Sequence, residues 1–175
     1  VNQAGSTASG STINNIVAAG ATGDATFTAT KGLSWASSVT SGNWITIKNG
    51  GSGASTTGSP QTINYTAAAN PSSSVRSGKI TVRAGDPSAG PTGDIVLNQL
   101  GATLSVSGAT TVAATASTDN TSTFTATPGL SWNVGIVSTD NWLSLKSTAS
   151  GTNNTPVAAQ NITYDAVVNP DESTR

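Results

Sequence analysis

Few side chains in this sequence could take part in catalysis. The chain of 175 residues has no histidine and no cysteine, so proton transfer and nucleophilic attack would rest on carboxylates, serine, lysine and tyrosine. A glycosidase needs two carboxylates facing each other across a cleft, but almost none of the eight acids recurs at matching positions. We interpret the acids as solvated turn residues and predict no catalytic residue: Asp24, Asp86, Asp94, Asp119, Asp140, Asp165, Asp171 and Glu172.

Metal sites and covalent cross-links have equally little support. Calcium needs clustered oxygen ligands, and Asp-x-Asx-x-Asx spacing is absent. We predict no metal site and no cofactor, although a cation shared at a junction between modules stays open. An intramolecular Lys–Asn isopeptide bond would need an acid beside the lysine; Lys48 and Lys146 recur, but no acid recurs next to them.

The four tryptophans offer the best chemistry for a ligand. An exposed indole ring can stack on a sugar, and Trp44 and Trp142 each begin an expected strand beside an asparagine, so these two are the candidate glycan contacts. A tryptophan on a central strand instead fills the core of a sandwich. We expect this core role for Trp35 and Trp132, and core or edge packing is also the favoured interpretation for the other two.

These residues occur in pairs because the sequence is repeated. The segment Phe27–Thr30 recurs as Phe124–Thr127, and each copy is followed by Gly-Leu-Ser-Trp. The asparagine before the second tryptophan is repeated as well. The remaining matched pairs are Gln61 and Gln160, Ile63 and Ile162, Tyr65 and Tyr164, Asn70 and Asn169, and Arg76 and Arg175.

The ends of the repeat predict the domain organisation. Val1–Gly5 matches Leu97–Gly101, so residues 1–5 are predicted to be the closing strand of a preceding module. Residues 6–101 form one complete module. Residues 102–175 form a second module that lacks its last two strands. We expect either a longer parent protein or strands from another chain to complete it, because unpaired strand edges are unstable.

Alternation of apolar and polar residues positions these features on strands. Within the complete module it predicts about seven short strands, spaced as in an immunoglobulin-like sandwich. Helical periodicity is absent. The expected fold is therefore all-β, with tandem immunoglobulin-like β-sandwiches of about seven strands each. The clearest apolar alternations fall at 25–29, 33–37, 44–47, 63–67 and 80–84, and the apolar run 95–97 predicts a strand covered on both faces.

Several polar residues have expected structural roles. Arg76 and Arg175 follow an Asn-Pro turn, where we favour hydrogen bonds to backbone carbonyls over contact with an anion. Asn98 and Gln99 are expected at the boundary between modules, with bonds across it. Tyr65 and Tyr164 alternate with polar neighbours and are assigned to the core.

The order of short motifs along the chain resembles that of the BACON domain, an immunoglobulin-like module of Bacteroidetes surface proteins. The motifs are Ser-Trp, Asn-Trp, Ile-x-Tyr, Asn-Pro, Arg-x-Gly-x-Ile-x-Val and Val-Leu-Asn-Gln. The resemblance covers both repeats. It implies an extracellular sandwich that acts as a spacer or binds carbohydrate or mucin. It implies no catalytic residue.

Composition narrows the range of partners. Only 9% of the residues are charged and the net charge is −1. The seven basic residues are scattered, which argues against nucleic acid and anionic membrane surfaces. No apolar run approaches the roughly 20 residues of a membrane span.

The sequence therefore favours a non-catalytic, rigid spacer in a large extracellular or cell-surface bacterial adhesin or filament, with neighbouring modules as partners. One alternative is a carbohydrate- or mucin-binding module of a glycan-degrading enzyme or phage fibre, with a glycan or host-surface ligand. Another is a self-assembling fibre subunit that exchanges strands. The junction Gln99–Thr103 has almost no slack, which favours a stiff connection.

Overall fold

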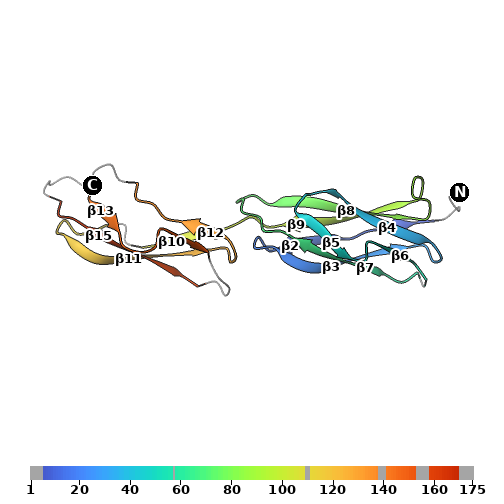
Figure 1. Ribbon diagram of the computed structural model, residues 1–175, viewed down its shortest axis with the longest axis horizontal. Coiled ribbons are helices and arrows are strands. Elements are labelled where there is room, and N and C mark those ends of the chain that lie inside the picture. The colour runs from blue at the N-terminus through green and yellow to red at the C-terminus, as the bar shows by residue number, and fades with distance from the viewer. Residues whose placement is uncertain (1–5, 57, 109–110, 138–140, 153–157, 170–175) are drawn as a thin grey trace. The chain divides into compact units, whose positions relative to one another are not determined.

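The computed structural model describes residues 6–56, 58–108, 111–137, 141–152 and 158–169. All the regular elements in these ranges are β-strands (Figure 1), which confirms the predicted all-β class. The chain divides into two compact units, Val1–Ala102 and Thr103–Arg175. The predicted strand at 1–5 and the predicted role of Arg175 lie outside the described residues. Within the described ranges, no helix is long and apolar enough to cross a membrane.

The first sheet of unit 1 is antiparallel throughout. Its strands, in the order β1-β3-β7-β5, are Ala8–Ser9, Ala21–Ala29, Gln61–Ala67 and Ile45–Asn49. Alternation decides which face is buried, because successive side chains on a strand point to opposite sides. Threonines fill many of the outward positions of β3 and β7, where a β-branched side chain supports the strand without adding charge.

The second sheet of unit 1 has the order β2-β9-β8-β4-β6. Its strands are Thr12–Ile16, Thr92–Gln99, Arg76–Ala84, Ser34–Ser41 and Ser52–Ala54. β2 runs parallel to β9, and its register shifts between Ile13 and Ile16. Asn15 lies in this shift with φ 60°, a left-handed conformation that asparagine tolerates better than most residues.

The two sheets of unit 1 share one apolar core. Ile63, Ile80, Ile95 and Leu97 are completely buried at its centre. Val96 is only half-buried, so the prediction that this run is covered on both faces is wrong: β9 alternates like its neighbours. The other core residues are Ile16, Ala25, Phe27, Ala29, Trp35, Trp44, Ile45, Tyr65, Ala67, Val82 and Ala84.

Unit 2 contains two smaller sheets. One has the order β10-β11-β15-β13, formed by Leu104–Ser107, Ser117–Ala126, Gln160–Ala166 and Leu143–Leu145. The other pairs β12, Ser131–Asn133, with β14, Ser150–Thr152. A T-shaped contact between Phe124 and Trp132, with ring centroids 4.9 Å apart, matches the 4.6 Å contact between Phe27 and Trp35 in unit 1.

Candidate functional site

Trp44, one of the two candidate glycan contacts, is part of the core of unit 1. Only 8% of the residue is exposed, and the Arg76 guanidinium carbon lies 4.6 Å from the ring centroid. Gly78 approaches the ring so closely that an added Cβ would lie 3.0 Å from Trp44 Cζ2. The ring therefore has no open face for a sugar, and the hypothesis of glycan contact at Trp44 is wrong. Sequence position could not reveal this, because Trp44 lies in the turn before β5 and the covering arginine lies on β8.

Arg76 connects three segments of unit 1 near the end of β9. Its Nη2 donates hydrogen bonds to the carbonyls of Ala68 and Ala69, at 2.8 and 2.9 Å. Its Nε donates to Gln99 Oε1 at 2.8 Å. Burial lowers the pKa of Arg76, but an arginine side chain stays charged. The guanidinium thus bridges β8, β9 and the segment after β7.

Gln99 and Asn98 form their bonds inside unit 1. Gln99 is fully buried and donates from Nε2 to the carbonyls of Val17 and Ala68, at 3.0 and 2.9 Å. Asn98 accepts from Ser77 and donates to Asn14. The expectation that these two residues bond across the module boundary is therefore wrong. Their partners lie on the flanking strands β2 and β8 and in the segments that follow β2 and β7.

Asn70 holds the segment that leaves β9. Its side chain is 1% exposed and its Nδ2 donates to the carbonyls of Ser74 and Leu100, at 2.9 Å each. The Leu100 amide donates to Ile16 at 2.8 Å, and the Ala102 amide donates to Ser72 at 2.7 Å. The last residues of unit 1 are therefore hydrogen-bonded as far as Ala102.

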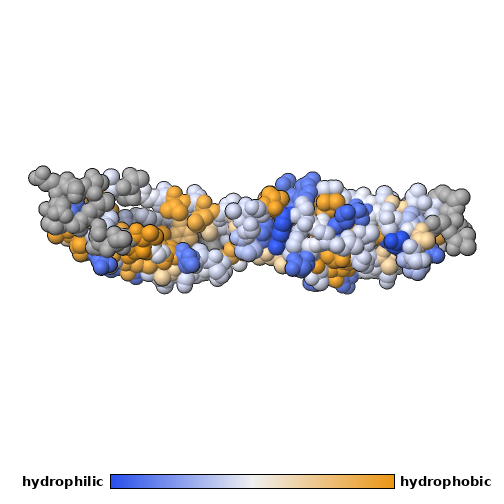
Figure 2. All heavy atoms as spheres, turned by 90° about the horizontal axis from the view of Figure 1, so that it is seen from above, coloured by the Kyte–Doolittle hydropathy of each residue, from blue (hydrophilic) through white to orange (hydrophobic). Residues whose placement is uncertain are grey.

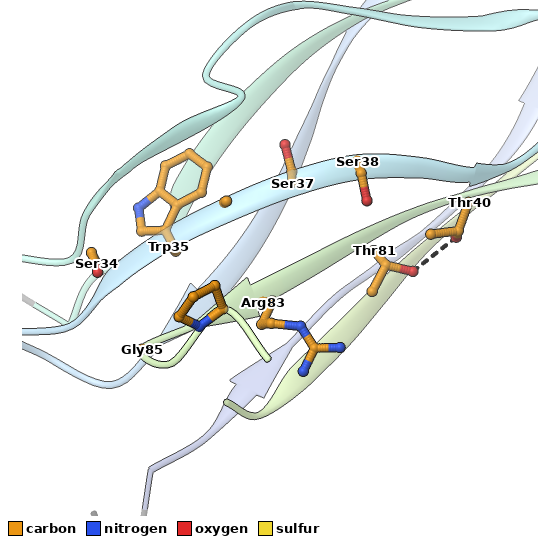
Figure 3. A pocket seen from close by; sticks show the side chains of 10 residues that line it. Ser34, Trp35, Ser37, Ser38, Thr40, Thr81, Arg83 and Gly85 are labelled. Carbon is orange, nitrogen blue, oxygen red and sulfur yellow. Dashed lines mark hydrogen bonds between the residues drawn. The ribbon is translucent and has the colours of Figure 1, made fainter. Parts of the chain in front are cut away.

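An open groove of about 440 Å³ lies on the outer face of β4 and β8. Figure 3 shows hydroxyl groups and the Arg83 guanidinium along it, while the ring of Trp35 points to the other side of β4. Thr40 and Thr81 share a hydrogen bond of 2.9 Å, and Arg83 Nη1 donates to the Gly90 carbonyl at 2.8 Å. The lining combines these polar groups with apolar surface from residues such as Ala36 and Pro87. Sequence reasoning missed this groove, because serines and threonines occur throughout the chain.

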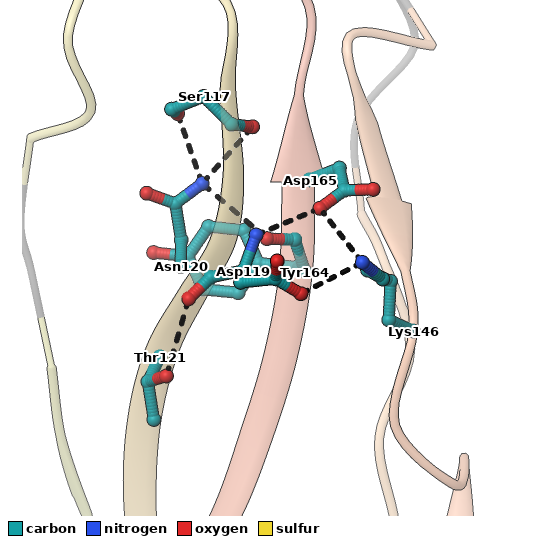
Figure 4. Close-up of polar contacts among 7 residues, drawn as sticks. All are labelled: Ser117, Asp119, Asn120, Thr121, Lys146, Tyr164 and Asp165. Atoms are coloured by element: carbon teal, nitrogen blue, oxygen red, sulfur yellow. Dashed lines mark hydrogen bonds and ion pairs between the residues drawn. The ribbon is translucent and has the colours of Figure 1, made fainter.

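A polar cluster on unit 2 surrounds Lys146. Its Nζ lies 2.7 Å from Asp119 Oδ1 and 3.7 Å from Asp165 Oδ1, and the Asp119 amide donates to Asp165 at 2.9 Å (Figure 4). The hydrogen bond to Asp119 is the main reason that the pKa of Lys146 is raised. Isopeptide formation needs a neutral amine, whereas this lysine is held as an exposed ammonium. The cluster is therefore an ion-pair network.

The other expected site residues divide between buried and half-buried positions. Trp35 and Tyr65 are buried, at 6% and 4% exposure, and burial is the main cause of the raised pKa of Tyr65. Trp132, Tyr164 and Trp142 are half-buried. Trp142 therefore stays a candidate ligand contact. No group of three potential metal-binding side chains occurs in the ranges that the structure describes.

Comparison with known proteins gives one family. Residues 34–100 match the BACON family, described as "Putative binding domain, N-terminal". This confirms the resemblance over those residues. The BACON segment begins at β4 and extends through β9, so it contains both the groove and the contacts among Arg76, Gln99 and Asn70.

Two further comparisons say less. A crystal structure of a protein of unknown function from Porphyromonas gingivalis W83 is 9% identical, with a TM-score of 0.31; the alignment covers 84% of this chain and 76% of that one. No curated protein matches. The BACON description names a binding domain and not a catalytic one.

Proposed function

We propose that the chain is a non-catalytic segment of a large extracellular bacterial adhesin or surface filament. Its tandem immunoglobulin-like sandwiches act as a rigid spacer, and its partners are neighbouring modules. The BACON match supports a binding or surface module, and such domains occur in Bacteroidetes surface and secreted proteins. The buried aromatic side chains of unit 1 support a structural role for those residues.

The observation that carries the spacer proposal is the connection between the units. The Ala102 amide is bonded to Ser72 in unit 1, at 2.7 Å. The next amide, that of Thr103, donates to Thr127 Oγ1 in unit 2 at 2.8 Å. These two consecutive residues are thus hydrogen-bonded within different units, and no free residue separates the two anchoring points. Because the range of a linker grows with its number of free residues, this connection favours restricted motion.

Distance measurements between two spin labels test the proposal. The chain has no cysteine, so Thr46→Cys in β5 and Ser144→Cys in β13, both at exposed positions, give one label on each unit. We expect a narrow distance distribution that broadens when Gly-Ser-Gly-Ser is inserted between Ala102 and Thr103. A native distribution as broad as that of the insertion variant would overturn the spacer proposal.

The groove on β4 and β8 favours a second candidate function, saccharide binding. Hydroxyls and a guanidinium along an open groove suit the hydroxyls or acidic groups of a glycan chain. On a glycan and mucin array, this candidate predicts saturable binding that Arg83→Ala reduces. Trp142→Ala tests the contact proposed for unit 2. Absence of binding across a broad array would leave the spacer role alone.

A further inference from the structure

The turn that follows β5 contains the only Asn-Gly pair of the sequence, Asn49 and Gly50. In such a pair the main-chain nitrogen of the glycine can attack the side-chain amide of the asparagine, because glycine has no Cβ to obstruct the approach. Whether this happens in a folded chain depends on how firmly the two groups are held. The structure describes both residues.

Neither group is held by a hydrogen bond among the residues that the structure describes. The side chain of Asn49 is exposed and has no partner there, and the Gly50 amide donates to no acceptor in the same ranges. β5 lies at the edge of its sheet, where part of the backbone points away from the neighbouring strand. Nothing in the described ranges therefore withholds the Gly50 nitrogen from reaction.

The fold requires glycine at this reactive position. Gly50 has φ 73°, a left-handed conformation that other residues rarely adopt. An added Cβ would lie 2.5 Å from the Thr62 carbonyl oxygen. The turn between β5 and β6 thus excludes the larger residues that would slow the attack. In unit 2 the residue after Lys146 is Ser147, so the matching turn of the second repeat lacks the reactive pair.

We propose that Asn49 is a site of spontaneous deamidation, and that the isoaspartate product releases β6 from β4. The Gly50 nitrogen loses its proton to hydroxide and attacks the side-chain carbonyl carbon of Asn49. A new bond from nitrogen to carbon closes a cyclic imide, the bond to the side-chain nitrogen breaks, and ammonia leaves. Water then opens the imide at either carbonyl and gives aspartate or isoaspartate. The net reaction exchanges ammonia for water and needs no oxidant and no enzyme.

The product adds a carboxylate to a surface with few charges. Only 9% of the residues are charged, and the net charge would change from −1 to −2. Most of the surface in Figure 2 has the pale tones of weakly polar residues. Asn49 lies opposite Asn64, whose side chain donates a hydrogen bond to Asp24. The new charge therefore arises close to an existing carboxylate.

Isoaspartate also lengthens the main chain. The link to Gly50 then runs through the former side chain, which adds a carbon atom to the backbone. Both sides of this link are anchored: Asn49 pairs with Asn64 of β7, and the Gly51 carbonyl accepts from the Ser37 amide at 2.7 Å and from Ser37 Oγ at 3.1 Å. One anchor must shift to absorb the extra atom. The bonds to Gly51 are the weaker anchor, because β6 has three residues and β5 has five.

Mass spectrometry of the full chain tests the modification. After incubation at mildly alkaline pH, trypsin cuts behind Lys48 and Arg76 and releases residues 49–76. This peptide should be heavier by about 1 Da, since a carboxyl group replaces an amide, with fragment ions that locate the change at Asn49. Isoaspartate should exceed aspartate, and the rate should rise with pH because the attacking nitrogen must lose its proton. An unchanged Asn49, under conditions in which a synthetic peptide of residues 45–54 deamidates, would overturn the inference.

Amide hydrogen exchange at Ser37 measures the release of β6, because this amide donates to the Gly51 carbonyl. We expect exchange about tenfold faster in the isoaspartate form, from the loss of the bonds to Gly51. Asn49→Asp carries the charge without the extra carbon atom and Asn49→Ser carries neither, so both should exchange at the native rate. Native exchange in the isoaspartate form, or equal acceleration in Asn49→Asp, would contradict the proposed release. This inference concerns unit 1 alone and does not depend on the spacer role.

Discussion

Replacing Arg76 with alanine should destabilise unit 1 more than any other single loss of charge on its surface. The substitution removes three hydrogen bonds of 2.8–2.9 Å and the contact with the Trp44 ring. It also leaves Gln99 Oε1 without its donor, in a residue that is completely buried.

The expected magnitude follows from these contacts. A hydrogen bond from a charged donor contributes about 1.5–3 kcal/mol and an unpaired buried acceptor costs about 1–3 kcal/mol. The cation–π contact adds about 0.5–1 kcal/mol at a partly exposed site. These contributions overlap and Arg76 is partly hydrated, so we expect a loss of about 3 kcal/mol in the free energy of unfolding of unit 1.

Amide exchange at Ile80 and Leu97 measures this loss in unit 1 alone, because both residues are at the centre of its core. The matched control is Arg83→Ala on the same strand, which loses one hydrogen bond to Gly90 and should cost about 1.5 kcal/mol, half the loss expected for Arg76→Ala. Arg76→Lys should fall between the two, because an ammonium cannot reproduce the planar fork. Equal effects for the two alanine variants would refute the reasoning.

Two further predictions concern unit 1. Gly78→Ala would place Cβ 2.4 Å from Ile45 Cδ1, and should lower the melting temperature through a loss of about 1–3 kcal/mol. In Gly51→Ala the added Cβ would make only an ordinary contact of 3.9 Å with Ile47 Cγ2, so this variant should change little, and equal shifts would contradict this. The pKa of Asp86 is lowered to about 2, chiefly by the Ser88 hydroxyl. Its stabilising contribution is therefore present above the ordinary carboxyl pKa and is lost as the pH falls towards 2. A carbon-detected NMR titration should show this midpoint and a higher one in Ser88→Ala; the same midpoint in both would exclude the hydroxyl as the cause.

Local alternation was enough to predict the strands of unit 1 that have one buried face. Thr and Ala or Phe alternate over 25–29, and the structure buries Ala25, Phe27 and Ala29. The pattern succeeds because the two faces of such a strand have different environments, so each residue type reports its side. The all-β class followed from the same signal.

Features that depend on distant segments could not be predicted in this way. Trp44, in the turn before β5, is buried because Arg76 and Gly78 of β8 contact it, and no neighbour in sequence shows this. The same Ser-Trp motif begins an eight-residue strand in unit 1 and a three-residue strand in unit 2. In unit 1 this strand pairs with both β6 and β8, whereas among the described residues of unit 2 it pairs with β14. The length of the strand therefore depends on its pairing partners and not on the motif.

If the chain acts as a rigid spacer, the connection at Ala102 and Thr103 restricts the motion of one unit against the other. Nitrogen-15 relaxation of the unmodified chain tests it directly, because it gives a rotational correlation time for the amides of each unit. For a rigid spacer, we expect the strands of both units to share one slow correlation time that fits a body of the whole chain. Two shorter times, each fitting a body of one unit's size, would show that the units tumble independently and would contradict the spacer role.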